Sequence, residues 1–234
     1  MVDHVEPPLR PATLERALEH ADVVFLPLLN KRYMRDLARY RLLLASGEQA
    51  SGERADALVR WWEALTAVMT GHQRAMSEVF WTLLLSKGSE YETVVASMNT
   101  RYESLEPARA EAGQKLTDAL RARAAPASAH FPFRRFHEEM SALSFWQETE
   151  LLSPALRTFT AADWVRVESF VLTAQAAQDT LDFVLPWLCD GLSADRADRL
   201  FSAFPASLAR LHHSVWLPQF ERFAAQAWPG ETAS

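Results

Sequence analysis

The sequence predicts an all-α protein, a four-helix up-down bundle followed by a helical C-terminal extension. Ala, Leu, Arg and Glu, which are good helix formers, dominate the composition, and only seven glycines occur in 234 residues. Apolar residues recur at intervals of three and four over long segments joined by short loops, as in helical bundles. With 49% hydrophobic residues the chain can bury a substantial core. We therefore expect a single domain over residues 1–234, with the bundle at 13–156 and the extension at 160–228.

The first expected helix covers residues 13–45 and follows a proline-containing arm at residues 1–12. Pro27 lies inside this segment, and we expect a kink or break just before it because proline lacks the amide hydrogen that a helix interior needs. From Asn30 the apolar residues recur every three or four positions. Ser46 and the glycine after it end the helix.

The second and third helices are expected over residues 53–85 and 89–123. The second has an inward stripe that steps by three and four throughout: Trp62, Leu65, Met69, His72, Met76 and Val79. The third places Tyr102 on its inward stripe, and we expect Pro107 to kink it.

The fourth helix is expected over residues 133–153, after a loop at residues 124–132. Pro154 is expected to stop it, because a helix interior does not accommodate proline well. These four helices make up the predicted bundle.

Three further helices form the expected extension. Thr160 is the expected N-cap of the first of them, with Asp163 in its first turn. We expect Pro186 to interrupt this helix. The three helices are expected over residues 161–189, 194–204 and 206–228.

Composition and motifs exclude several classes of function. The formal net charge is -6 and no basic block is present, so we expect no nucleic-acid partner. The single cysteine, Cys189, excludes an intrachain disulfide and a thiolate metal cage, and we interpret it as a small packed residue. Neither a leader sequence nor an apolar run of membrane-spanning length is visible, so we expect a cytoplasmic monomer or homodimer without a membrane partner. No phosphate loop or nucleophile elbow occurs, and we expect no cofactor.

Six polar or soft side chains lie where the bundle stripes would otherwise be apolar: Asn30, His72, Met76, Tyr102, Ser144 and Glu148. Only His72 and Glu148 are good iron ligands among them, and two ligands do not make a tight metal site. Most of the six also have an ordinary explanation as core groups satisfied by local hydrogen bonds or by packing. Glu148 fits that explanation least, because an inward carboxylate without a partner is costly.

Several other residues are expected to complete a cavity around these groups. His137, Ser144 and Glu148 are separated by seven and four residues, so they share one helix face. His137 would line the cavity about 10 Å along the helix axis from Ser144. Three tryptophans flank the stripes and would form a wall for a flat or aromatic ligand: Trp62, Trp81 and Trp146.

Four stretches of the chain resemble the hemerythrin-like (HHE cation-binding) family, in particular its actinobacterial members with a helical C-terminal extension. They are Asn30–Leu37, His72–Trp81, Met98–Pro107 and Ser144–Pro154, and with Leu185–Gly191 and Trp216–Phe220 they span about residues 30–220. In that family motif His and Glu residues bind a dinuclear iron centre. The resemblance places those ligand positions at Asn30, His72, Met76, Tyr102, Ser144 and Glu148, four of which lack a ligand-type side chain. The resemblance therefore implies the family's fold without its oxygen-binding or iron chemistry.

We favour the hypothesis of a metal-independent enzyme that uses the emptied iron cavity for acid/base chemistry on a small molecule. Isomerisation, cyclisation, dehydration and ring opening are suitable reactions. Glu148 would be the general base or acid, His72 its partner and Tyr102 a hydroxyl donor to a developing oxyanion. The expected substrate-binding residues are Asn30, Met76, Ser144, His137, Trp62, Trp81 and Trp146.

Three alternatives stay open from the sequence. The first is a non-catalytic binding or sensing protein with the same pocket. The second is a residual iron-binding protein that recruits His137, Glu78 or Glu150 in place of the lost ligands. The third is a structural protein with a filled core.

Overall fold

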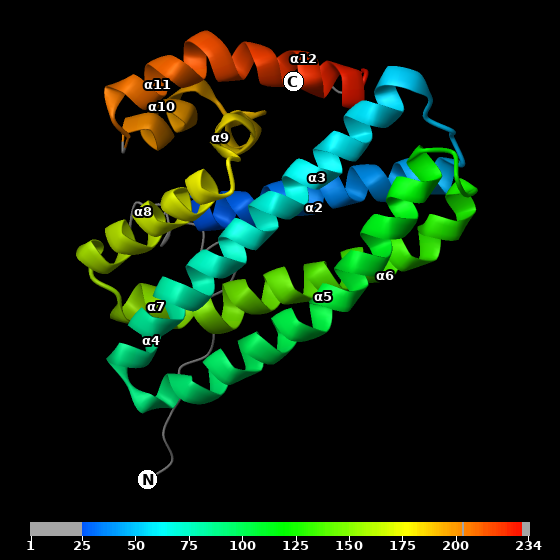
Figure 1. Cartoon of the computed structure of the whole chain (residues 1–234). Helices are drawn as coiled ribbons and strands as arrows, with labels where there is room; N and C mark the ends of the chain where they lie inside the picture. Colours follow the sequence, from blue (N-terminus) through cyan, green and yellow to red (C-terminus); the bar gives the residue numbers. More distant parts are fainter. Residues whose placement is uncertain (1–24, 203, 231–234) are drawn as a thin grey trace.

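The computed structural model describes residues 25–202 and 204–230, and within these ranges the chain forms helices and turns without any strand (Figure 1). The predicted all-α class is confirmed. The expected arm at residues 1–12 and the helix start at 13–24 lie outside the described residues. No helix in the described part is long and apolar enough to cross a membrane.

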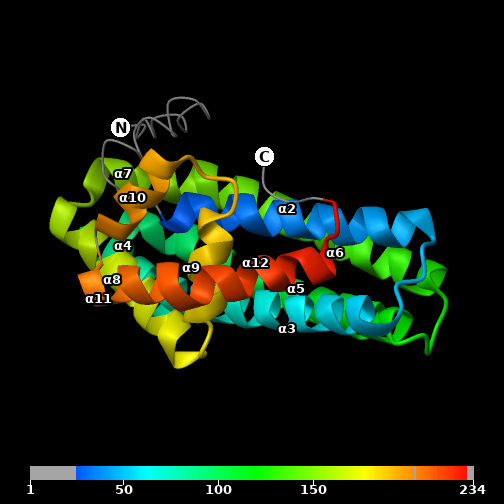
Figure 2. The same cartoon turned by 90° about the horizontal axis from the view of Figure 1, so that it is seen from above.

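The first part of the described chain forms long helices, two of which contain a π-helical turn. Helix α5 packs along α6, α2 packs along α6, and α3 contacts α5, so these helices lie side by side (Figure 2). The elements are α2 (Phe25–Ser46), α3 (Gly52–Ala75), the π-helical turn η1 (Met76–Phe80), α4 (Trp81–Lys87), the 3-10 turn η2 (Ser89–Tyr91), α5 (Glu92–Leu120), α6 (Pro126–Trp146), the π-helical turn η3 (Gln147–Leu152) and α7 (Ser153–Thr158).

The remaining helices are shorter. Helices α8 and α12 pack on α3, and α9 contacts both α2 and α12 (Figure 1). The elements are α8 (Ala161–Ala177), α9 (Leu181–Cys189), α10 (Ala194–Ser202), α11 (Ala206–Leu211), the π-helical turn η4 (His212–Trp216) and α12 (Leu217–Ala227).

The inward stripe predicted for the second helix is confirmed, because all six of its residues are buried. The N-cap of α8 is also confirmed. The backbone N–H of Asp163 donates to Thr160 Oγ1 at 3.2 Å, and the Thr160 N–H donates back to Asp163 Oδ2 at 2.8 Å. This reciprocal pair satisfies two backbone donors that a helix start leaves without partners.

Three helix boundaries expected from the sequence are wrong, and each of them had been placed at or near a proline. Helix α6 begins at Pro126, so the expected loop at residues 124–132 is largely helical. Pro154 does not stop the chain's helical course, because it lies in the first turn of α7, where a missing amide hydrogen is tolerated. Pro186 lies inside α9, and the interruption falls earlier, at residues 178–180.

A buried carboxylate joins three helices of the fold. Asp36 on α2 is fully buried, and its Oδ2 accepts the indole N–H groups of Trp61 on α3 and Trp187 on α9, each at 2.7 Å. Its Oδ1 accepts from Arg35 at 2.8 Å and from Arg39 at 3.2 Å. The charge is thus matched by two guanidinium groups, which makes its burial tolerable.

Helix α2 also holds the end of α9. Arg32 donates from Nε and Nη2 to the Leu188 carbonyl at 3.2 and 2.9 Å, and Arg35 Nη1 forms an ion pair with Asp190 at 2.7 Å. These contacts fix the C-terminal helices against the helices that surround His72.

Candidate functional site

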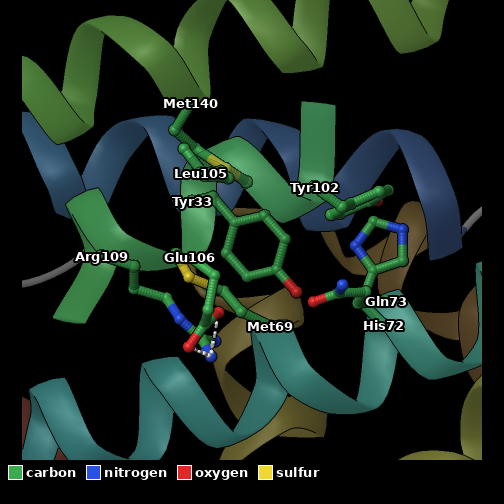
Figure 3. Close-up of a pocket in the computed structure, with 9 residues that line it drawn as sticks. All are labelled: Tyr33, Met69, His72, Gln73, Tyr102, Leu105, Glu106, Arg109 and Met140. Atoms are coloured by element: carbon green, nitrogen blue, oxygen red, sulfur yellow. Dashed lines mark hydrogen bonds and ion pairs between the residues drawn. The ribbon is translucent and has the colours of Figure 1, made fainter. Parts of the chain in front are cut away.

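His72 lines two small cavities between the helices. The first has a volume of about 20 Å³ and is drawn in Figure 3; it is lined by Tyr33, Met69, His72, Gln73, Tyr102, Leu105, Glu106, Arg109 and Met140. The second has a volume of about 10 Å³ and is lined by Leu26, Asn30, His72, Met76, Gln147, Leu151 and Leu152. Each is the size that one water molecule needs.

The His72 ring is neutral in the folded protein. It is buried and stacks on Tyr33, with ring centroids 5.9 Å apart and planes inclined by 19°. Burial lowers the pKa of His72 to about 4 and raises the pKa of Tyr33 well above its usual value. At neutral pH the two rings therefore provide hydrogen-bonding groups without charge.

Tyr102 and Gln147 form a buried hydrogen bond beside His72. The Gln147 amide Nε2 donates to the Tyr102 hydroxyl at 2.5 Å, and burial raises the pKa of Tyr102. Because the phenol oxygen accepts this bond, the hydroxyl proton is left to donate to another group. Tyr102 lines the larger cavity and Gln147 the smaller one.

The structure places Glu148 differently from the sequence-based expectation. Glu148 is half-buried and lines neither cavity, whereas the preceding Gln147 is buried and faces inward. Gln147 follows Ser144 by three residues, and a spacing of three lies on the same helix face as a spacing of four. The inward position after Ser144 is therefore Gln147 at a spacing of three, and η3 begins at this residue.

Three buried oxygens at predicted site positions or in the cavity lining have no hydrogen-bond partner in the described part of the chain, although Ser144 itself lines neither cavity. They are Asn30 Oδ1, Tyr33 Oη and Ser144 Oγ. Buried polar atoms are almost always paired with protein, water or ligand. These three atoms therefore mark the interior as suited to a small polar guest.

The larger cavity reaches the surface beside an ion pair on α5. Arg109 donates to Glu106 at 2.7 Å, and its Nη1 lies 3.5 Å from the Thr66 carbonyl and 3.3 Å from Thr70 Oγ1 on α3. Glu106 is exposed. Figure 3 shows the Tyr33 ring between this pair and His72. The sequence reasoning missed this pair, although a Glu and an Arg three residues apart beside the inward Leu105 give a signal for it.

Four other predicted site residues line neither cavity: His137, Trp62, Trp81 and Trp146. His137 is half-buried, and burial together with the neighbouring Arg41 lowers its pKa. Trp81 is buried against Tyr102, with ring centroids 5.7 Å apart. Trp62 is buried on α3, and Trp146 is half-buried under the guanidinium of Arg101, 4.7 Å from its ring centroid. The three tryptophans do not form one wall.

The donor groups around His72 do not fit a dinuclear iron centre. The buried positions supply one imidazole, with an amide, a thioether, a phenol and a hydroxyl from Asn30, Met76, Tyr102 and Ser144. Iron sites of this class use several imidazoles and carboxylates. The described residues contain no group of three or more His, Cys, Asp or Glu that could hold a metal ion.

The replacement ligands considered from the sequence lie apart from this interior. Glu78 is about half exposed and pairs with Arg74 at 2.7 Å, while Glu150 is exposed.

No protein-family model matches this sequence, and neither a curated protein nor a solved structure shows significant similarity to the chain.

Proposed function

We propose that this chain is a hemerythrin-like four-helix up-down bundle whose iron positions have been substituted, and that it binds a small molecule in the interior around His72. The positions given by the family resemblance support the fold. Asn30 on α2, His72 on α3 with Met76 four residues later on η1, and Tyr102 on α5 come from three separate segments, and each lines at least one of the two cavities. Such convergence is expected if these residues occupy the places of former metal ligands.

The binding function is carried by one observation: an uncharged interior with oxygens that lack partners. Asn30 and Tyr33 offer such oxygens in the cavities that the neutral His72 lines, and Ser144 adds a third buried oxygen on α6. A guest with hydrogen-bond donors would satisfy them, and a charged guest would lose its hydration without an opposite charge to replace it. The part of the ligand that enters this interior should therefore be small, polar and neutral.

The size of the cavities limits how the guest enters. Volumes of about 20 and 10 Å³ are far below the roughly 300 Å³ of an ordinary ligand pocket. A guest larger than water needs the Arg109–Glu106 pair to move, and a partly exposed pair of this kind contributes only about 0–1 kcal/mol. Opening at this pair is thus inexpensive.

Recovery of a bound molecule tests the proposal. The protein is purified under native conditions, and its small-molecule content is extracted and identified by mass spectrometry. Wild type should retain one species that His72→Phe loses, because phenylalanine fills the space and offers no ring nitrogen. His137→Phe is the matched control, since His137 lines neither cavity, and it should retain the species. Absence of any species from wild type, or equal retention by both variants, would contradict binding around His72.

A second candidate function is acid/base catalysis at the same interior, of the isomerase, cyclase, dehydratase or ring-opening type. The free hydroxyl proton of Tyr102 favours it, since a neutral phenol beside a neutral imidazole can stabilise a developing oxyanion. If the reaction takes place in these cavities, Tyr102→Phe should lower turnover of the recovered molecule at least a hundredfold. Glu148→Gln should then change it less than threefold. Proton NMR of substrate and product gives both rates. A larger loss of turnover in Glu148→Gln than in Tyr102→Phe would instead identify Glu148 as the acid/base group.

A further inference from the structure

A surface groove lies between α3 and α5. It adjoins the larger of the two cavities that His72 lines. It has a volume of about 440 Å³ and is lined by residues that include Trp62, Thr66, Glu106, Arg109, Arg121 and Arg123. Glu106 and Arg109 also line the smaller cavity. The groove and the interior around His72 therefore meet at the Arg109–Glu106 pair.

The two ends of this groove differ in charge. Arg109 is paired with Glu106 at one end. Arg121 and Arg123 at the other end are exposed and form no ion pair with any described residue. Arg121 follows Arg109 by twelve residues, which is about 18 Å along a helix axis. Glu63 lines the middle of the groove, so the distal end is the part with an excess of positive charge on a chain of net charge -6.

At this end of the groove, several of the last carbonyl oxygens of α5 accept hydrogen bonds. The last carbonyls of a helix normally repel negative charge. Here the Thr117 carbonyl accepts the N–H of Arg121 at 3.0 Å, and the Asp118 carbonyl accepts the N–H of Arg123 at 2.8 Å. The Ala119 carbonyl accepts the side-chain amide of Gln49 at 3.0 Å. These hydrogen bonds leave fewer free carbonyl oxygens to oppose an anion, and Arg121 and Arg123 together outweigh the single carboxylate of the last turn, Asp118, which accepts from Gln114 at 3.0 Å.

The groove has an aromatic wall that requires a glycine. A Cβ atom at Gly113 would lie 2.7 Å from Nε1 of Trp62, so only glycine lets the α5 backbone approach the indole this closely. Trp62 is fixed from behind by Phe133 and Phe136, with ring centroids 5.5 and 6.0 Å away. The body of a ligand held at the arginines would lie against this rigid edge.

We propose that the α3–α5 groove binds small molecules that carry a carboxylate or phosphate group, with the anion held by Arg121 and Arg123. This inference rests on the proposed binding function and deepens it, because the uncharged end of such a molecule would point toward Arg109 and the cavity at His72. Arg121 and Arg123 line the same groove, and a guanidinium group can form paired hydrogen bonds with either anion.

Titration with inorganic phosphate and, separately, with acetate tests the anion site. Amide chemical shifts in the NMR spectrum report where each ion binds. Arg121→Ala/Arg123→Ala should weaken binding at the groove at least tenfold. Arg166→Ala/Arg210→Ala removes the same charge from two exposed arginines that form no ion pair with a described residue, and it should bind as wild type does. Phosphate binding alone would identify phosphorylated ligands, and binding of both ions would identify the shared anion chemistry.

The outcomes separate this inference from the proposed function. His72→Phe should keep the anion site intact, because the arginines are distant from the imidazole, while it loses the molecule retained in the interior. Equal affinity of both double variants and wild type, or no shift at the groove at millimolar concentrations, would overturn the anion site. Circular dichroism of each variant checks that its helices are retained.

Discussion

At the scale of single residues, burial determines what His72 can do. An imidazole transferred from water into a packed interior loses more hydration in its charged form than in its neutral form, so its pKa falls. With a pKa of about 4 it is a weak base at neutral pH and a good hydrogen-bonding group. His72 therefore suits recognition of a neutral group better than proton abstraction.

This burial makes stability depend on pH. The unfolded chain takes up a proton on His72 near its ordinary pKa of 6.5, whereas the folded protein keeps the ring neutral down to about pH 4. As the pH falls through this window the unfolded state binds more protons, so the free energy of unfolding should decrease by up to about 1.4 kcal/mol per pH unit. Urea unfolding at pH 7, 6 and 5 measures this slope, and His72→Gln should reduce it.

The control for this prediction is His130→Gln, since His130 lies in α6 and is only partly buried, whereas His72 is buried. It should reduce the slope less than His72→Gln does. His212, whose pKa burial also lowers to about 4, contributes to the slope of every variant equally. A His72→Gln slope equal to that of wild type would contradict the prediction.

Residue-scale prediction from the sequence succeeded where helical periodicity was regular. His72, Met76 and Tyr102 fall on apolar stripes of regular spacing, and all three are buried as expected. Asp36 lies on the same kind of stripe, three residues after the buried Tyr33, so its position contained a signal that was missed. What the stripe could not show is that two indole N–H groups from other helices meet the carboxylate.

At the scale of elements, π-helical turns separate the sequence pattern from the structure. Turn η1 begins at Met76 and η3 begins at Gln147, so both lie beside the cavities around His72. Such turns contain an extra residue and are frequent at functional sites. A hydrophobic pattern with a period of 3.6 cannot locate them. It also allows both Gln147 and Glu148 to share the face of Ser144, so it could not decide which of the two is buried.

Close helix packing near the site also depends on small residues that the sequence does not single out. A Cβ atom at Gly71 of α3 would lie 2.8 Å from the side-chain nitrogen of Gln175 on α8. That nitrogen donates to the Val68 carbonyl at 2.9 Å, and the amide oxygen accepts from Thr180 Oγ1 at 2.7 Å. The buried amide thus ties α8 and the turn after it to α3, one turn before His72.

At the scale of the whole molecule, the C-terminal helices are joined to the site helices by charge as well as by apolar contact. Trp187 and Asp36 are separated by 151 positions. Local periodicity holds no information about which distant tryptophan meets a buried carboxylate. The existence of the later helices was predictable, but this connection required the three-dimensional structure.

The Asp36 connection should make α9 and the site helices unfold together. Asp36→Asn leaves one acceptor oxygen, which can face either the two indole N–H groups or the two guanidinium groups, while the new NH2 group faces donors on the other side. It also leaves Arg35 and Arg39 without their buried carboxylate. Breaking a buried, hydrogen-bonded charge in this way typically costs about 3–5 kcal/mol, and we expect a loss of this size in urea unfolding. Amide hydrogen exchange in α9 should accelerate more than in α5, because Trp187 of α9 donates to Asp36 and the hydrogen bonds of Asp36 do not reach α5.

Glu78→Gln provides the matched comparison, because Glu78 and Arg74 form an ion pair in which both side chains are about half exposed. Its removal should change the free energy of unfolding by less than about 1 kcal/mol. Similar losses in the two variants would mean that Asp36 acts as an ordinary surface charge. A large loss for Asp36→Asn alone would instead show that one carboxylate couples the C-terminal helices to the helices around His72, so that disturbing either part changes the other.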